Sequence, residues 1–187
     1  MKILISLSNT IYDVAPADRA KYVSDECYRH ILRSVGGIFV LFPGMRGWFK
    51  GVRFTKKLTS SFDPFDRFLV LSTHGLDGSV ADANKVISLS NKPGFCVFQA
   101  QGLDSLIMHE LGHAYDHWVR HMLKRRAHPE TELSEYQDMK AEFRKVLGSP
   151  SEYALKNSQE WFAEQFALEV MSGKKRMLDQ IESRLAL

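Results

Sequence analysis

Residues 103–120 read LDSLIMHELGHAYDHWVR and include the pentapeptide HELGH at positions 109–113. On a helix, positions i and i+4 lie on one face, about 6 Å apart along the axis, so the imidazole rings of His109 and His113 can bind one metal ion. Glu110 lies beside this pair and can reach a water molecule on the same ion. Two histidines at this spacing with a glutamate between them are typical of zinc hydrolases.

The surrounding residues predict an amphipathic helix over 104–125, with Asp104 or Ser105 as its N-cap. Its apolar positions recur every three or four residues, and they are Ile107, Leu111, Ala114, Trp118 and Met122. At about 100° per residue, the two histidines face away from this apolar stripe. We therefore expect the helix to bury one face in the core and to present its histidines to a cleft.

A catalytic zinc ion takes three protein ligands and keeps a fourth position for water. His117 and His121 continue the four-residue spacing, but His117 is about 12 Å from His109 along the axis. Rings so far apart cannot share an ion whose bonds to nitrogen are near 2.1 Å. A third histidine six residues after His113 would be another known arrangement, but valine occupies position 119. The third ligand must therefore come from another segment.

Residues 157–167, NSQEWFAEQFA, offer this ligand. The segment predicts a helix that is apolar around most of its circumference, yet Glu160 and Glu164 lie one turn apart on the same side. Burial of a carboxylate costs several kcal/mol unless a partner compensates it. We predict that Glu160 binds the metal and that Glu164 accepts the free ring N–H of a ligand histidine, with Asp116 a second candidate for that role. The alternative is an exposed acidic stripe on an ordinary amphipathic helix.

Hydrophobic patterning over the whole chain predicts an α+β fold with a small twisted sheet, mixed or antiparallel. The expected strands are residues 2–7, 37–42, 52–55, 67–72, 85–90 and 95–99. The expected helices are residues 16–35, 104–125, 131–147, 158–172 and 173–186. A chain of 187 residues, 44% hydrophobic, fits one domain. We expect an N-terminal subdomain (1–126) with the sheet and the HExxH helix, and a helical C-terminal subdomain (127–187) that supplies the third ligand.

The formal net charge of +3 does not indicate a nucleic-acid partner. The excess lies in residues 120–126 and 174–176, near predicted helix ends, where cations interact favourably with the helix dipole. Nucleic-acid binding would require a longer basic face or a recognisable set of stacking aromatic residues. No run of about 18 apolar residues exists, so we also expect no membrane partner.

The cysteine content and the N-terminal residues of the sequence indicate the cellular compartment of the protein. The two cysteines, Cys27 and Cys96, are too few for a disulfide framework, and we expect free thiols in reducing surroundings. Residues 1–14 carry no convincing cleavage site and predict a first strand rather than a signal peptide. We therefore expect a cytoplasmic protein, with export by a route without a signal peptide left open.

HELGHAYDH, followed 40 residues later by SEYALKNSQEWFAEQFA, resembles the catalytic domains of anthrax lethal factor and the bacterial Pro-Pro endopeptidases. These are gluzincins, in which two histidines and a glutamate hold zinc within a zincin-like fold. Besides the pentapeptide, the similarity includes Asp116, Tyr153, Asn157 and the E-x-F-A-E run. The resemblance implies that His109, His113 and Glu160 bind zinc, that Glu110 is the general base, and that Tyr153 reaches the reacting carbonyl of a peptide or protein substrate.

Two alternatives remain open at this point. The first is a regulatory intracellular peptidase similar to the ImmA/IrrE proteins, which also pair an HExGH helix with a downstream glutamate segment and cut a repressor. The second is a binding protein that keeps zinc for structure, with His117, Asp116 or His74 closing the fourth position. For a peptidase, strand 85–90 or 95–99 is our expected substrate-binding edge, because peptides often pair with exposed strand edges.

Overall fold

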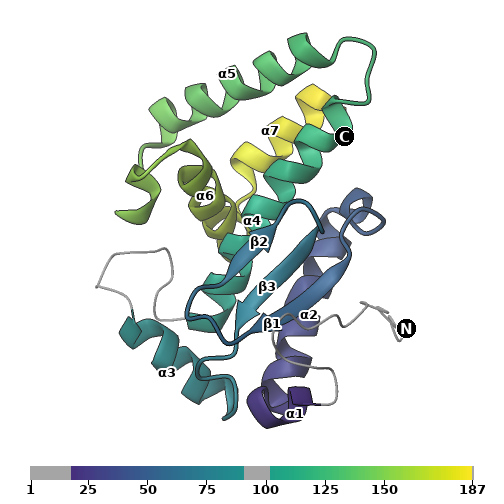
Figure 1. The fold of residues 1–187 in the computed structure, drawn as a ribbon. Coiled ribbons are helices and arrows are strands. Elements are labelled where there is room, and N and C mark those ends of the chain that lie inside the picture. Colours follow the sequence, from purple (N-terminus) through teal and green to yellow (C-terminus); the bar gives the residue numbers. More distant parts are fainter. Residues whose placement is uncertain (1–17, 91–101, 187) are drawn as a thin grey trace.

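The computed structural model describes residues 18–90 and 102–186, which form an α+β fold of seven α-helices and a small mixed sheet (Figure 1). The helices are α1 (Arg19–Tyr22), α2 (Asp25–Leu41), α3 (Val80–Ser90), α4 (Gly102–Leu123), α5 (Pro129–Leu147), α6 (Ser158–Ser172) and α7 (Arg176–Leu185). Two 3₁₀ turns, η2 (Pro43–Met45) and η4 (Tyr153–Leu155), join them. Within the described ranges, every helix is too short or too polar to span a lipid bilayer.

The sheet has the strand order β1-β3-β2. Its strands are β1 (Gly51–Thr55), β2 (Ser61–Asp63) and β3 (Phe68–Ser72). β3 lies in the middle, parallel to β1 and antiparallel to β2, with Leu69 opposite Val52 on one side and Phe62 on the other. The predicted strands 52–55 and 67–72 are confirmed. β2 was not predicted, and it forms one edge of the sheet in the part of the chain that the structure describes.

Helix α2 corrects two predictions. The described residues of the helix expected over 16–35 form two helices, α1 and the first part of α2. Ser24 is the N-cap of α2, and its hydroxyl accepts a hydrogen bond from Cys27 N–H. The strand expected over 37–42 is instead the last part of α2 and the residue after it. Gly36 and Gly37 do not end the helix, because the apolar stripe continues beyond them and its side chains are buried in the core.

The strand expected over 85–90 is also wrong, because these residues belong to α3. Ser79 and Asp82 form a reciprocal cap at the start of this helix: Ser79 N–H donates to the carboxylate, and Asp82 N–H donates to the hydroxyl. This capping box fixes the helix start. The predicted strands 2–7 and 95–99 and the expected free thiol of Cys96 lie outside the described residues.

The helices after residue 102 agree with prediction, with shifted ends. α4 begins at Gly102, so Asp104 and Ser105 lie in its first turn and neither is the N-cap. The Asp104 carboxylate pairs with His30 and accepts a hydrogen bond from Ser34. The apolar stripe of α4 is buried down to Trp118, whereas Met122 is 39% exposed. The predicted helix 158–172 is confirmed without change.

Helix α4 connects the two parts of the molecule. At its start it packs on α2 and α3, further along it contacts β2 and β3, and on its other side it contacts α5 and α6 (Figure 1). Its buried side chains, among them Leu111, Tyr115 and Trp118, join one continuous core with residues of the sheet and of α6. A residue on α4 is therefore held from both sides, which suits a helix that carries a site.

Candidate metal centre

Three predicted ligands converge between α4 and α6. The Nε2 atoms of His109 and His113 are 3.2 Å apart. Glu160 Oε2 lies 3.1 Å from the first of these atoms and 3.3 Å from the second. The three atoms form a nearly equilateral triangle. Ligand atoms about 2.1 Å from a tetrahedral zinc ion would be separated by about 3.4 Å, so the triangle matches three corners of such a site.

The polar atoms of this triangle could hold a cation between them. Glu160 Oε2 is buried, and within the described residues it makes no directed hydrogen bond, although both ring nitrogens are at ion-pair distance. A buried carboxylate oxygen without such a bond is costly. In the described part of the chain, His109, His113 and Glu160 are the group of ligand-type side chains that could hold a metal ion. The donor set of two imidazoles and a carboxylate suits zinc.

Gly112 brings α6 close enough to complete the triangle. A Cβ atom at this position would lie 2.7 Å from Ala163 Cα and 3.0 Å from Ala163 O, closer than such atoms can pack. Helices that approach this closely need a residue without a side chain at the contact. Gly112 lies between the two histidines and Ala163 lies between Glu160 and Glu164, so the same contact sets the position of all four groups.

Asn157 fixes the start of α6. Its side-chain oxygen accepts hydrogen bonds of 2.9 Å from both Gln159 N–H and Glu160 N–H, as an N-cap residue does. Glu160 therefore lies in the first turn of α6, where the helix dipole favours a negative charge. The sequence had shown Asn157 as part of a resemblance, and the structure gives its physical role.

Glu164 lies where the sequence predicted a partner for a ligand histidine. Its side chain is fully buried, and Oε1 accepts a hydrogen bond of 2.7 Å from Nδ1–H of His109. This bond places the proton on Nδ1 and turns the Nε2 lone pair toward the centre of the triangle. Burial lowers the pKa of His109, but the carboxylates of Glu160 and Glu164 outweigh it and raise the pKa to about 10. The His109 ring is thus surrounded by carboxylates.

Glu110 is buried beside the triangle, at the edge of the sheet. Burial raises the pKa of its carboxyl, whereas His109, His113 and the backbone N–H of Phe62 in β2 act in the opposite direction. A carboxyl with a raised pKa can both accept and return a proton. Phe62 was not identified from the sequence, because a strand as short as β2 gives no periodic signal.

Tyr153 packs against His109, with ring centroids 5.5 Å apart. It belongs to η4, just before α6, and is partly exposed. Lys156 Nζ lies 3.5 Å from its hydroxyl oxygen. Burial, followed by the charge of Glu160, raises the pKa of the phenol, so the hydroxyl keeps its proton and can donate it in a hydrogen bond.

Asp116 does not take the role predicted for it. Its carboxylate accepts hydrogen bonds from Tyr136 (2.8 Å), Lys140 (2.7 Å) and Arg120 (2.9 Å), and none of its bonds within the described residues goes to a ligand histidine. Burial raises the pKa of Asp116, but Lys140 and Arg120 outweigh burial and hold the pKa below its usual value. The physical reason is the position of α5, whose polar side chains reach this carboxylate. Asp116 therefore joins α4 to α5.

The remaining histidines proposed for a closed zinc site lie elsewhere. His117 packs against Phe62, with ring centroids 5.8 Å apart, and faces a separate pocket. His74 is exposed in the loop that follows β3. Of the residues missed at the sequence level, Gly112 had the clearest signal, because a glycine in the middle of a helix often marks a close approach.

Comparison of the chain with protein-family models, with curated proteins and with solved structures gave no match. The chemistry of the site is therefore inferred from its own residues. Two imidazoles and a carboxylate converge on one point, a buried carboxyl lies beside them, and a tyrosine ring packs against one of the imidazoles. This arrangement can hold a cation and can move a proton next to it.

Proposed function

We propose that the chain is a zinc-dependent endopeptidase of the gluzincin type with a zincin-like fold. The triangle of His109, His113 and Glu160, whose sides are 3.1 to 3.3 Å, is the observation that carries this proposal. These three residues would hold zinc and leave its fourth position open. A zinc ion supplies polarisation of the scissile carbonyl and a lowered pKa for water at the site.

The side chains around the triangle fit the proton transfers of peptide hydrolysis. Glu110 takes a proton from the attacking water and delivers it to the leaving amine, which requires a carboxyl with a raised pKa such as this one. Tyr153 donates a hydrogen bond to the oxyanion that develops on the carbonyl, and its raised pKa keeps the donor proton in place. Glu164 keeps His109 in the tautomer and orientation that a ligand needs.

β2 is the substrate-binding edge in this proposal and replaces strand 85–90, which is helical. The strand lies at an edge of the sheet among the described residues and contacts α4. The backbone N–H of Phe62 acts on Glu110, so this edge faces the proposed base. An extended peptide that pairs with β2 would pass beside the metal ligands.

The two alternatives differ in their support. A structural zinc site needs a fourth protein ligand, but Asp116 is hydrogen-bonded to α5 and His117 faces another pocket. An ImmA/IrrE-like peptidase would use the same metal centre, and its distinguishing feature is a repressor substrate. Cleavage of one folded repressor, with short peptides left intact, would favour that alternative over a general endopeptidase.

The test is cleavage of a proteome-derived peptide library by the zinc-loaded protein, with products identified by mass spectrometry. We expect wild type to cut peptides and Glu110→Gln to bind zinc without cutting. Glu135→Gln on α5 is the matched control, because Glu135 is exposed and outside the site. Equal cleavage by Glu110→Gln and wild type would contradict the proposed mechanism.

A further inference from the structure

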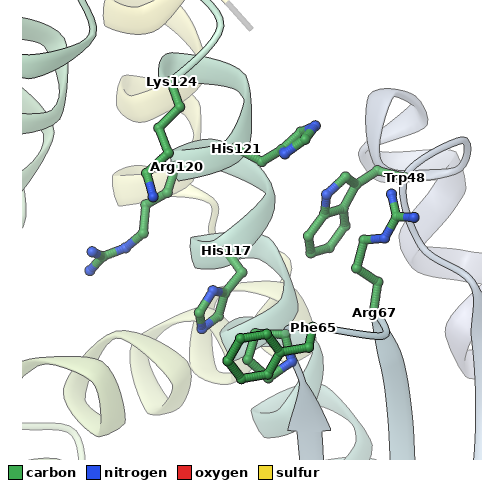
Figure 2. A pocket seen from close by; sticks show the side chains of 8 residues that line it. Trp48, Phe65, Arg67, His117, Arg120, His121 and Lys124 are labelled. Atoms are coloured by element: carbon green, nitrogen blue, oxygen red, sulfur yellow. The ribbon is translucent and has the colours of Figure 1, made fainter.

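A cavity of about 460 Å³ lies between α4 and the loop that joins β2 to β3. Figure 2 shows His117 of α4 near Phe65 and His121 near Trp48, with Arg67 beside Trp48 and Lys124 alongside Arg120 on the other side of α4. The floor is aromatic, since Trp48 packs on Phe62 and lies 6.2 Å from the His121 ring. None of the three predicted metal ligands lines this cavity.

The charge of this cavity is entirely positive. Its lining contains Arg67, Arg120 and Lys124 and, among the described residues, no carboxylate. Arg120 Nε donates to Asp116, and in Figure 2 its guanidinium points away from Trp48. Arg67 and Lys124 make no ion pair within the described part of the chain, so their charges remain available to a ligand.

The β2–β3 loop is built to present this surface. Asp63 holds the turn by accepting hydrogen bonds from the backbone N–H groups of Phe65 and Asp66. Asp66 pairs with Arg53 of β1 at 2.8 Å, so its negative charge is already compensated. Arg67 has a φ of 62°, in the left-handed region that a branched or bulky residue rarely adopts. Phe65 is 94% exposed at the mouth of the cavity.

The cavity lies about one helical turn along α4 from the metal centre. His117 follows His113 by one helical turn, and Phe65 follows the end of β2 by two residues. Four to eight residues of α4 correspond to about 6–12 Å along the axis, and an extended peptide advances about 3.3 Å per residue. A peptide that pairs with β2 therefore reaches the cavity two to four residues from the bond beside the metal ligands.

We propose that this cavity, which we call the cationic pocket, is a specificity subsite that binds an acidic side chain of the substrate two to four residues from the scissile bond. The positive charges of Arg67 and Lys124 attract the carboxylate, and Phe65 and Trp48 pack on its aliphatic part. The inference rests on the proposed peptidase function for its biological meaning. The binding of an acidic side chain depends only on the residues of the cationic pocket.

The first experiment measures binding without cleavage. The probes are two rhodamine-labelled, C-amidated octapeptides, one of alternating Ala and Glu and the other of alternating Ala and Gln. Their anisotropy is titrated with zinc-loaded Glu110→Gln protein at low salt. We expect the Glu probe to bind about tenfold more tightly than the Gln probe, as two partly exposed charge pairs allow.

Two double variants locate the preference. Arg67→Gln/Lys124→Gln removes both available cations of the cationic pocket and should abolish the tenfold preference. Arg33→Gln/Lys145→Gln changes one exposed arginine and one exposed lysine outside the pocket, and should keep it. Equal binding of the two probes, or a preference that survives in the pocket variant, would overturn the proposal.

Cleavage then separates this inference from the proposed function. In the peptide library, wild type should select Asp or Glu at one position two to four residues from the cut, and the pocket variant should lose this selection. Its kcat/KM for an uncharged peptide should stay at the wild-type value. Cleavage without acidic preference would refute the subsite and leave the peptidase. Pocket-dependent binding without Glu110-dependent cleavage would refute the peptidase and leave the pocket.

Discussion

Gly112→Ala tests the contact that assembles the metal centre. The new Cβ would lie 2.7 Å from Ala163 Cα and 3.1 Å from Phe166 Cβ. Carbon atoms in contact prefer about 3.7 Å, so α4 and α6 would have to separate by roughly 1 Å. Neighbouring atoms cannot absorb this by a rotamer change, because the nearest ones belong to the backbone.

The separation should cost both stability and metal affinity. Overpacking of this kind costs about 1–3 kcal/mol, whereas alanine in place of glycine within a helix gains about 1 kcal/mol, so we expect a net loss of about 1 kcal/mol. Metal ligands tolerate displacements of about 0.2 Å. Moving Glu160 by several times that distance should weaken zinc binding at least about tenfold, comparable to the loss of a supporting hydrogen bond.

Urea unfolding of the metal-free protein and a competitive zinc titration measure the two effects separately. Gly37→Ala is the matched control, since Gly37 lies inside α2 and a Cβ there would meet nothing within 4 Å. That variant should be more stable than wild type by about 0.5–1 kcal/mol and bind zinc normally. A Gly112→Ala protein as stable as Gly37→Ala, with wild-type zinc affinity, would refute the reasoning.

Three further predictions follow from the site. Glu164→Gln should leave the fold intact but weaken zinc binding about 10- to 100-fold in the competitive titration, because His109 loses its charged partner; unchanged affinity would count against that role. Tyr153→Phe should bind zinc as wild type does and lose about 10²- to 10³-fold in kcat, and a change in zinc affinity alone would contradict the oxyanion role. The pKa of Asp116 is lower in the folded state, so its stabilisation is complete at neutral pH and disappears as pH falls below about 4. The difference in unfolding free energy between wild type and Asp116→Asn should therefore shrink with acidification, and a constant difference down to pH 2 would rule this out.

Strong helical periodicity made one half of the site predictable. The HELGH histidines and the buried pair Glu160 and Glu164 stand out because their spacing matches one helix face and because buried carboxylates demand partners. The structure brings these side chains together as expected. What the spacing could not show is the close contact at Gly112, which depends on a second helix distant in sequence.

The errors have equally physical causes. Residues 38–42, IFVLF, have strand-like composition, yet core packing keeps them in or next to α2. Residues 85–90 lie in a helix whose start is set by the short polar cap at Ser79. β2 is three residues long, too short for a periodic pattern. The cationic pocket lies between α4 and the β2–β3 loop, and a local sequence pattern cannot predict a contact between segments that are distant in sequence.

The central claim is that His109, His113 and Glu160 hold one zinc ion. The most direct measurement is zinc content by elemental analysis after dialysis, for wild type, Glu160→Ala and the exposed control Glu135→Ala. We expect about one zinc per chain in wild type and control, as a site with three protein ligands binds, and little or none in Glu160→Ala. Full zinc content in Glu160→Ala, or none in reconstituted wild type, would contradict the account.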